Sequence, residues 1–296
     1  MIVGPAPRIR QTLYSAWRIL AVLFVWDLAV TVFYFVVPFK APALPITLLG
    51  TAVALFIGFR DTSAYQRWWE GRILWGAMIN ASRSLTRGVI AFLPDDHAGA
   101  LSIKRILVLR QIAYVQALRR QLRREDPAPE IHRLLGEEGG RDALARANPA
   151  NALLEGNARL IATVCREGLI DTIQQTQLEA VLVDVANAQG GMERLKNTPL
   201  PAQYRSFPAF FTRMLCIFAP IGMVESLGWA TPIGSSVAGF MFLVGLQIAD
   251  DLVDPFAGTV HDVPLTAMCR TIEIDLLQSI GEEAPPPLVP VKGVLW

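Results

Sequence analysis

The chain has 296 residues, of which 52% are hydrophobic and only 18% charged, and its formal net charge is +1 at pH 7. Soluble domains carry about 25% charged residues, so this composition predicts more apolar structure than an ordinary core needs. The near-neutral charge gives no sign of nucleic-acid binding. The three cysteines and three histidines are scattered, which favours neither a disulfide framework nor a metal site, and we expect no cofactor.

Four apolar stretches predict an all-α integral membrane protein with four transmembrane helices. A helix needs about 20 apolar residues to cross the hydrocarbon of a bilayer, and each stretch comes close to that length. The first is too long for a cleavable signal peptide, whose apolar region ends by about 15 residues. Buried helices in a soluble all-α protein are the alternative. The stretches are Ile19–Phe39, Ala41–Phe59, Phe207–Val224 and Trp229–Ala249.

Basic residues mark the cytoplasmic side of a membrane protein. Most of the 27 lysines and arginines lie between Arg60 and Arg205, and several arginines precede the first apolar stretch, whereas Lys40 alone separates the first two stretches. Both termini and the middle region are therefore expected in the cytoplasm. The excess of arginine over lysine favours a bacterium, hence its inner membrane. The predicted parts are residues 1–59, the cytoplasmic region 60–206, the spans 207–249 and the C-terminal part 250–296.

The middle region reads as a series of helices. The second span is expected to continue past Phe59 to about Thr86, because no proline interrupts its apolar pattern before Pro94. Ala98–Arg124 predicts an amphipathic helix whose end carries four arginines. A solvated helix end is the favoured interpretation of these arginines, and a lipid or nucleic-acid patch is the alternative. The four are Arg119, Arg120, Arg123 and Arg124.

Further helices follow a segment, Glu125–Asn148, that is expected to be a surface loop with at most one short helix. Asn148 before Pro149 favours a helix start, and that helix should run to about Arg166. Another is expected from near Asp171 to the stop signal Gly190–Gly191. The last should open at Asp262 and Pro264 and reach about Ile280, with an extended tail from Pro285.

Charged residues in or beside the spans suggest two sites. Asp27 and Arg213 are lone charges within apolar stretches, and we expect them to pair across the first and third spans. Asp250, Asp251 and Asp254 form a DDxxD pattern, which in helical prenyltransferases binds magnesium and diphosphate. No facing acidic motif accompanies it, so an acidic helix end is the favoured interpretation.

The second apolar stretch carries two neighbouring stripes. Gly50, Ala54 and Gly58 recur every four residues, a spacing that lets helices approach closely in lipid. One position on, Thr51, Leu55 and Phe59 form a larger stripe that could line a narrow pore. Apolar constrictions gate by expelling water. A lipid-facing helix explains this stripe equally well.

Three segments resemble the bestrophin family, in particular its bacterial branch. The first, Gly58–Gly76 or GFRDTSAYQRWWEGRILWG, contains Arg67, Trp68 and Trp69. The second begins at Gly190 and reads GGMERLKNTPLPAQY. The third, DPFAGTVHDVPL, begins with Asp254, Pro255 and Phe256. Their order and spacing fit, so the resemblance covers nearly the whole chain.

The resemblance implies an ion channel, not an enzyme, built as a homopentamer in the lipid bilayer with one axial pore. It places the pore neck on Thr51, Leu55 and Phe59, although the family has a bulky apolar residue where this chain has Thr51. A second, cytoplasmic constriction is expected near Leu169 or Ile170. No catalytic residue is expected. A membrane-embedded carrier and the prenyltransferase-like enzyme are the remaining alternatives.

The resemblance also bears on calcium and on the permeant ion. Animal bestrophins bind calcium through acidic residues after the Pro-Phe pair, and this chain has Thr259 and Asp262 at two of those positions. Loss of a carboxylate weakens a calcium site, so we expect no activation by calcium. The bacterial branch is associated with cations, so monovalent cations such as sodium are expected to be favoured. A chloride channel of the same family is the alternative.

Overall fold

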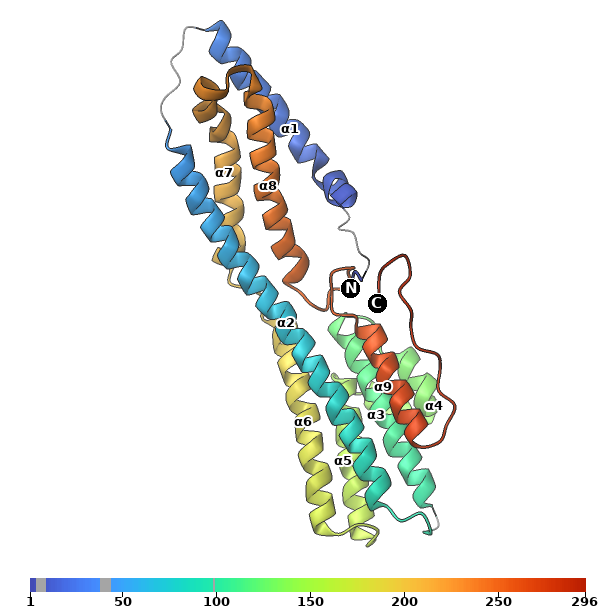
Figure 1. The fold of residues 1–296 in the computed structure, drawn as a ribbon. Coiled ribbons are helices and arrows are strands. Elements are labelled where there is room, and N and C mark those ends of the chain that lie inside the picture. The colour runs from blue at the N-terminus through green and yellow to red at the C-terminus, as the bar shows by residue number, and fades with distance from the viewer. Residues whose placement is uncertain (4–8, 38–43, 98) are drawn as a thin grey trace. The chain divides into compact units, whose positions relative to one another are not determined.

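The computed structural model describes residues 1–3, 9–37, 44–97 and 99–296, with side chains omitted for residues 9–16. Its described part is helical, apart from isolated β-bridges at Ile2–Val294 and Val291–Val294, which confirms the all-α prediction (Figure 1). The predicted helix starts at Ala41 and Ala98, and the basic residues Arg8 and Lys40, lie outside the described residues. The helices are α1 (Ile9–Val36), α2 (Ile46–Phe92), α3 (Ala100–Leu122), α4 (Ala128–Leu144), α5 (Pro149–Arg166), α6 (Thr172–Asn197), α7 (Ala202–Leu227), α8 (Thr231–Leu252) and α9 (Leu265–Ser279), with a 3-10 turn at Gly228–Ala230.

The chain forms two compact units, and α2 contributes to both. We call the first the core unit; it comprises Met1–Val3, Trp68–Thr198 and Pro255–Trp296. The second, the span unit, comprises Gly4–Arg67 and Pro199–Asp254.

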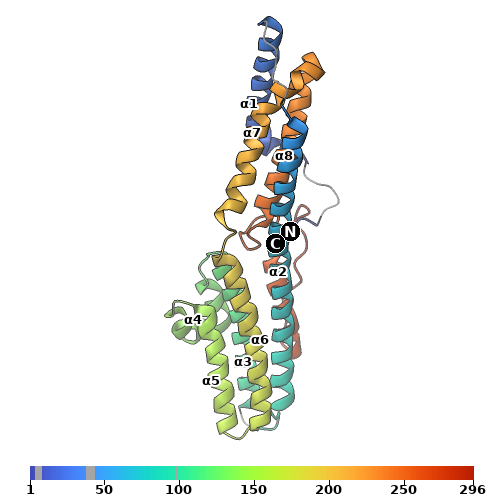
Figure 2. The ribbon, with the colours of Figure 1, turned by 90° about the vertical axis from the view of Figure 1, so that its left-hand side faces the viewer.

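In the core unit, α3 is the central helix and packs on α4, α5, α6 and α9 (Figures 1 and 2). Its buried residues run continuously from Gln111 to Arg119, so they occupy every side of the helix. The sequence predicted one apolar side only, and that was wrong because helices cover α3 all round. Trp75 and Tyr114 are completely buried in the same core.

Two helices of the core unit differ from their predicted extents. α6 continues through Gly190 and Gly191 to Asn197. Gly191 serves packing there, because a Cβ atom on it would lie 2.7 Å from Cδ2 of Leu74. α4 occupies most of the segment predicted to be a loop, with its helical backbone interrupted at Gly136, where φ is 72°.

The predicted starts of α5 and α6 are confirmed. The side chain of Asn148 accepts a hydrogen bond from the backbone of Asn151, at 3.0 Å, and Pro149 opens the helix. Asp171 forms a capping box with Gln174, in which each side chain accepts from the other residue's backbone N–H. The cap of α5 also has tertiary contacts, because Asn148 donates to Glu193 of α6 at 2.9 Å and Gln121 of α3 accepts from the backbone of Ala150 at 3.0 Å.

In the span unit, α1, α7 and α8 pack on one another. Val53 and Ile57 of α2 form a small buried cluster with Leu215 and Leu246. Large apolar side chains nevertheless face outward; Val22, Leu48 and Met241 are each 69% exposed. Among the residues that the structure describes, three helical segments are long and apolar enough to cross a membrane, and the third, Ala202–Leu252, contains α7, the 3-10 turn and α8.

Candidate functional site

The stripe of Thr51, Leu55 and Phe59 lies on an exposed side of α2. Leu55 and Phe59 are each 58% exposed, whereas Val53 and Ile57 are 6% exposed against α7 and α8. With 100° between successive residues, these two sets lie on opposite sides of the helix. The span unit therefore uses one side of α2 for its own packing and leaves the stripe uncovered.

The small residues of α2 do not have the packing role expected of them within one chain. Ala54 and Gly58 are exposed, and nothing lies within 4 Å of a Cβ atom built on Gly58. The larger Val53 and Ile57 make the contacts to α7 and α8 instead. Gly50 is half-buried, with Cζ of Phe242 4.0 Å from a Cβ built on it, so among the described residues of one chain the predicted close approach does not extend to Ala54 and Gly58.

Hydroxyl groups along α2 bond to its own backbone. Thr51 donates to the carbonyl of Thr47 at 2.8 Å, and Thr62 and Ser63 donate to the carbonyls of Gly58 and Phe59. Such i to i−4 bonds use the hydroxyl hydrogen within the helix. The exposed stripe thus presents methyl, isobutyl and phenyl groups and no formal charge.

Polar contacts tie α2 to the end of α8 within the span unit. Arg60, which is 4% exposed, pairs with Asp250, and Nε of Arg67 donates to the carbonyl of Val253 at 2.9 Å. Asp251 instead accepts from Gln247 at 2.8 Å. Asp250 and Asp251 therefore have separate partners, and the described residues contain no group of three His, Cys, Asp or Glu side chains placed to hold a metal ion.

Asp27, the lone charge of the first span, is buried and bonds to two serines of α8. Its two carboxylate oxygens accept hydrogen bonds from Ser235, at 3.2 Å, and Ser236, at 2.9 Å. The predicted ion pair between Asp27 and Arg213 was wrong, because the hydroxyl groups of two adjacent serines on α8 bind the carboxylate instead. Arg213 is exposed instead.

The three segments that carry the family resemblance meet in the core unit. Nε1 of Trp68 donates to the carbonyl of His261 at 3.0 Å, and Nζ of Lys196 donates to the carbonyl of Phe256 at 3.4 Å. A Cβ atom on Gly71 would lie only 3.0 Å from Cγ of Pro255. Phe256 is completely buried. These contacts explain why the segments have such unusual composition, since each fits closely against another.

The turn after Phe256 is held together by hydrogen bonds to the carboxylate of Asp262, which lies within the turn. Asp262 is 2% exposed and accepts hydrogen bonds from the backbone of Gly258 and Thr259 and from the hydroxyl of Thr259, the last at 2.6 Å. Gly258 has a φ of 88°, which only glycine adopts readily. Asp262 was expected to open α9, but Pro264 is the residue next to that helix.

The turn between α5 and α6 contains the residues predicted for a cytoplasmic constriction. Ile170 is 4% exposed and belongs to the core, whereas Leu169 is half-buried. Ile173, in the first turn of α6, is 68% exposed and was not predicted. Its exposed apolar side chain makes Ile173 a further candidate for the constriction. The sequence alone does not show which apolar side chains are exposed.

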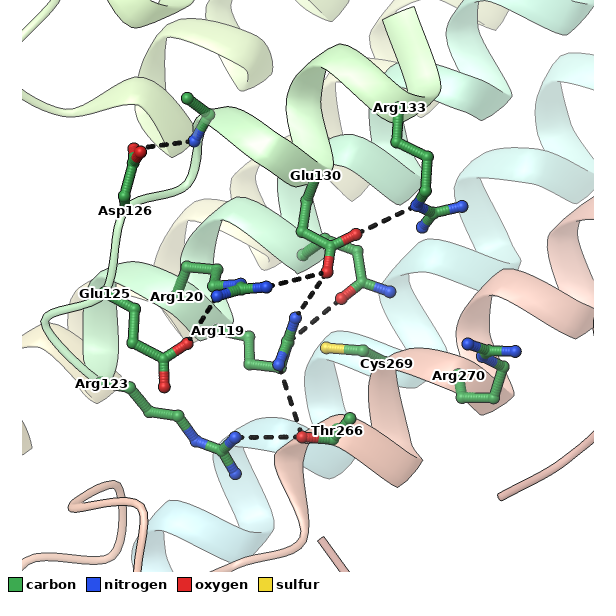
Figure 3. Close-up of polar contacts among 12 residues, drawn as sticks. Arg119, Arg120, Arg123, Glu125, Asp126, Glu130, Arg133, Thr266, Cys269 and Arg270 are labelled. Carbon is green, nitrogen blue, oxygen red and sulfur yellow. Dashed lines mark hydrogen bonds and ion pairs between the residues drawn. The ribbon is translucent and has the colours of Figure 1, made fainter.

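Three of the four arginines at the end of α3 bond to other side chains, and only Arg124 of the four is exposed as a solvated helix end would be. Arg119 is 6% exposed and donates to Glu130 of α4 at 3.0 Å and to Gln116 at 3.1 Å (Figure 3). Arg133 of α4 donates to the buried Glu273 of α9 at 2.8 Å. Instead of the expected solvated helix end, the structure has a network of ion pairs and hydrogen bonds that joins α3, α4 and α9. Its acids were missed because Glu130 lies in a segment predicted to be a loop and Glu273 lies in a distant helix.

Electrostatics in this network favour the charged states of Glu130 and Arg133. Burial opposes the charge on Glu130, but hydrogen bonds from Arg133 and Arg120 and the charges of Arg133 and Arg119 outweigh it, so the pKa of this carboxyl lies below its ordinary value. Cys269 lies beside the network, as Figure 3 shows, and complete burial raises the pKa of its thiol to about 12. The other free cysteines are Cys216, which is buried, and Cys165, which is partly exposed.

Comparison with known proteins assigns the family. The family model described as Bacterial/Fungal Bestrophin protein matches residues 8–278. The chain belongs to the bestrophin family. This confirms the resemblance drawn from the three segments.

Relatives of this bestrophin are bacterial. It is 36% identical over 247 residues to the Voltage-dependent anion channel-forming protein YneE of Escherichia coli strain K12, covering 83% of this chain and 80% of that protein. It is 31% identical over 248 residues to the Voltage-dependent anion channel-forming protein mll4386 of Mesorhizobium japonicum, covering 84% and 78%. A crystal structure of a bacterial Bestrophin homolog from Klebsiella pneumoniae matches with a TM-score of 0.83 and 31% identity, covering 89% of this chain and 98% of that one.

Proposed function

We propose that this bestrophin assembles as a homopentamer and conducts small monovalent ions through an axial neck lined by Thr51, Leu55 and Phe59. The observation that carries the proposal is the exposed apolar stripe on α2, opposite the side that packs on α7 and α8. A single chain leaves this stripe uncovered, and a ring of second helices would turn it inward. Uncharged narrow rings can gate by excluding water.

The proposed topology has four spans, α1, α2, α7 and α8, in a bacterial inner membrane with both termini in the cytoplasm. The distribution of basic residues supports this orientation. In this arrangement residues 1–59 and 207–249 belong to the membrane part, and residues 60–206 and 250–296 to the cytoplasmic part. The apolar exposure of α1, α2 and α8 fits contact with lipid.

The second constriction is proposed at the turn between α5 and α6. Leu169 is the candidate from the sequence prediction that retains exposed surface, because Ile170 belongs to the core. The exposed Ile173 is the adjacent apolar side chain that a ring at this level could also use. Shortening either one tests which of them faces the ion path.

The sign of the permeant ion does not follow from the stripe, which has no formal charge. Sodium was expected from the sequence to be favoured over chloride, but the relatives named above are described as anion channel-forming and give that expectation no support. Reversal potentials of the reconstituted protein in a sodium chloride gradient decide between the two. A shift toward the chloride equilibrium potential would reverse the expected preference.

Replacing Leu55 and Phe59 together by alanine tests the neck. Every subunit would lose both side chains, so single-channel conductance or open probability in planar bilayers should rise severalfold. Leu49→Ala with Phe56→Ala is the matched control, because it removes the same two side-chain types roughly 100° around the same helix. Unchanged currents in the first variant would show that the stripe faces lipid or a neighbouring helix. Projection images of the detergent-purified protein test the pentamer.

A further inference from the structure

The span unit contains a cavity that has no part in the proposed ion path. It has a volume of about 600 Å³ and opens between α7 and α8, with Arg60 of α2 and Ile19 of α1 on its wall. Cavities of 300–1,000 Å³ are typical of sites for small molecules. Most of the residues around it are basic or apolar, and Ser206, Gln247 and Asp250 complete the lining.

The basic lining comes mostly from one side of α7. Arg205 and Arg213 stand eight residues apart, which is two turns of helix and roughly 12 Å, and Ser206 lies beside Arg205 on the same side. Arg60 faces them from α2. Three guanidinium groups and a hydroxyl group thus border one cavity, together with the amide of Gln247 and the carboxylate of Asp250.

Only one of these arginines has a counter-charge. Asp250 pairs with Arg60. No ion pair joins Arg205 or Arg213 to any other residue that the structure describes, and both side chains are exposed. The cavity therefore carries two uncompensated positive charges. Arg213 stands out because it lies within an apolar span, where an unpaired charge is costly unless it reaches an anion or the interface.

The remaining walls are apolar. Ile19 and Phe210 are 53% and 55% exposed, and Leu243 and Val244 of α8 line the same cavity. Contact of these side chains with water is unfavourable, whereas contact with a hydrocarbon chain is favourable. The cavity thus offers cationic hydrogen-bond donors beside an apolar surface.

We propose that this cavity is a binding site for an anionic phospholipid, whose phosphate group is held by Arg205 and Arg213 and whose acyl chain lies along Phe210 and α8. Guanidinium groups bind phosphate oxygens with two parallel hydrogen bonds. Basic pockets between membrane helices bind anionic head groups in this way. Arg213 then has its counter-charge in the lipid. Arg60 neutralises Asp250, the acidic side chain in the cavity wall, so that carboxylate does not cancel the charges of Arg205 and Arg213.

The test measures retained lipid and does not depend on ion conduction. Wild-type protein in mild detergent is titrated with phosphatidylglycerol, phosphatidylcholine or inorganic phosphate, and binding is followed by native mass spectrometry. We expect phosphatidylglycerol to bind at least about tenfold more tightly than phosphatidylcholine. Arg205→Gln with Arg213→Gln should lose about tenfold in apparent affinity for phosphatidylglycerol. Arg205→Lys with Arg213→Lys should retain part of it, because charge remains but paired hydrogen bonds are lost.

A matched control is Arg141→Gln, which removes an exposed positive charge from α4 of the core unit. It should bind phosphatidylglycerol like the wild type. Equal binding of the two lipids, or equal binding by wild type and the double glutamine variant, would overturn the proposal. So would inorganic phosphate that displaces the lipid at equal concentration, because the site would then serve a free anion.

Failure here and failure of the channel proposal are distinguishable. A protein that conducts ions but shows no preference for phosphatidylglycerol loses only the lipid site. A protein that retains the lipid through Arg205 and Arg213 but shows no five-fold assembly loses only the channel. Gel filtration and thermal unfolding of each variant confirm that its fold is intact before binding is compared.

Discussion

The core unit and the span unit distribute the same types of side chain in opposite ways. In the core unit, Trp75, Tyr114 and Phe256 are completely buried, and charged groups enter the interior only with partners. In the span unit, Val22, Leu48 and Met241 face outward, while Asp27, Thr31 and Ser235 are buried. Water drives apolar groups inward in the first, whereas lipid removes that drive in the second. Polar contacts and close fit must then hold the spans together.

The largest expected effect contrasts two tryptophans. Trp75→Ala should destabilise the protein by about 4 kcal/mol, because it leaves a cavity in a closely packed core. Trp17→Ala, its control, removes a side chain that is 53% exposed in α1 and should change stability by less than about 1 kcal/mol. Denaturant titration in detergent micelles, followed by circular dichroism, measures both. Equal losses would contradict the contrast between the units.

Breaking the arginine network should cost somewhat less. Glu130→Ala leaves Arg119, which is 6% exposed, without its carboxylate partner, and we expect a loss of about 3 kcal/mol. Glu155→Ala is the control, because Glu155 pairs with Arg159 on an exposed face of α5 and should contribute less than about 0.5 kcal/mol. The same titration compares them. A small effect of Glu130→Ala would show that Arg119 finds water or another acid.

Acid should weaken the same network. The pKa of Glu130 is lower in the folded protein than its ordinary value of 4.5, so its contribution to stability is complete above that value. The contribution is lost as the pH falls through the lower, folded pKa. Stability profiles between about pH 6 and 3 should therefore fall less steeply for Glu130→Gln than for the wild type. Parallel profiles would contradict the lowered pKa.

A smaller effect is expected from the polar contact between α1 and α8. Asp27→Ala should cost about 1 kcal/mol, since hydrogen bonds between membrane helices average roughly 0.6 kcal/mol and Asp27 accepts two. A double-mutant cycle with Ser236→Ala measures the coupling directly. Fully additive effects would show that the two side chains do not interact. The coupling free energy shows how much a polar contact contributes to holding the spans together, where apolar burial contributes less than in the core unit.

No effect is expected from calcium. The carboxylate of Asp262 already accepts hydrogen bonds from Gly258 and Thr259, and Thr259 offers no second carboxylate. Currents of the reconstituted protein should therefore be the same in micromolar calcium and in excess chelator. A steep calcium dependence would mean that this turn opens to form a cation site.

The sequence predicted the helices whose signals are local. The apolar stretches gave α1, α2, α7 and α8, and the caps at Asn148 and Asp171 gave the starts of α5 and α6. The spacing of Leu55 and Phe59 predicts that they lie on one side of α2, but it does not predict that this side is exposed. The predicted roles of these residues in a pore still await measurement.

The predictions that failed depended on tertiary contacts. Gly191 looks like a helix stop, but its missing side chain makes room for Leu74. Asp27 seemed to need a cation, whereas two serines satisfy it. Arg119 looked solvated because its acid, Glu130, belongs to a segment that read as a loop. In each case the deciding neighbour is invisible to patterns of spacing and composition.

The cysteines have a practical consequence for spectroscopy. Cys216 and Cys269 are buried, and the raised pKa of Cys269 keeps its thiol protonated, so neither should react readily with a maleimide. Cys165 is partly exposed and its carbonyl accepts from Gly168, directly before Leu169. A fluorophore or spin label added to the unaltered protein should therefore attach beside the turn between α5 and α6. Distances between labels on different subunits would then report that turn's separation across an assembly.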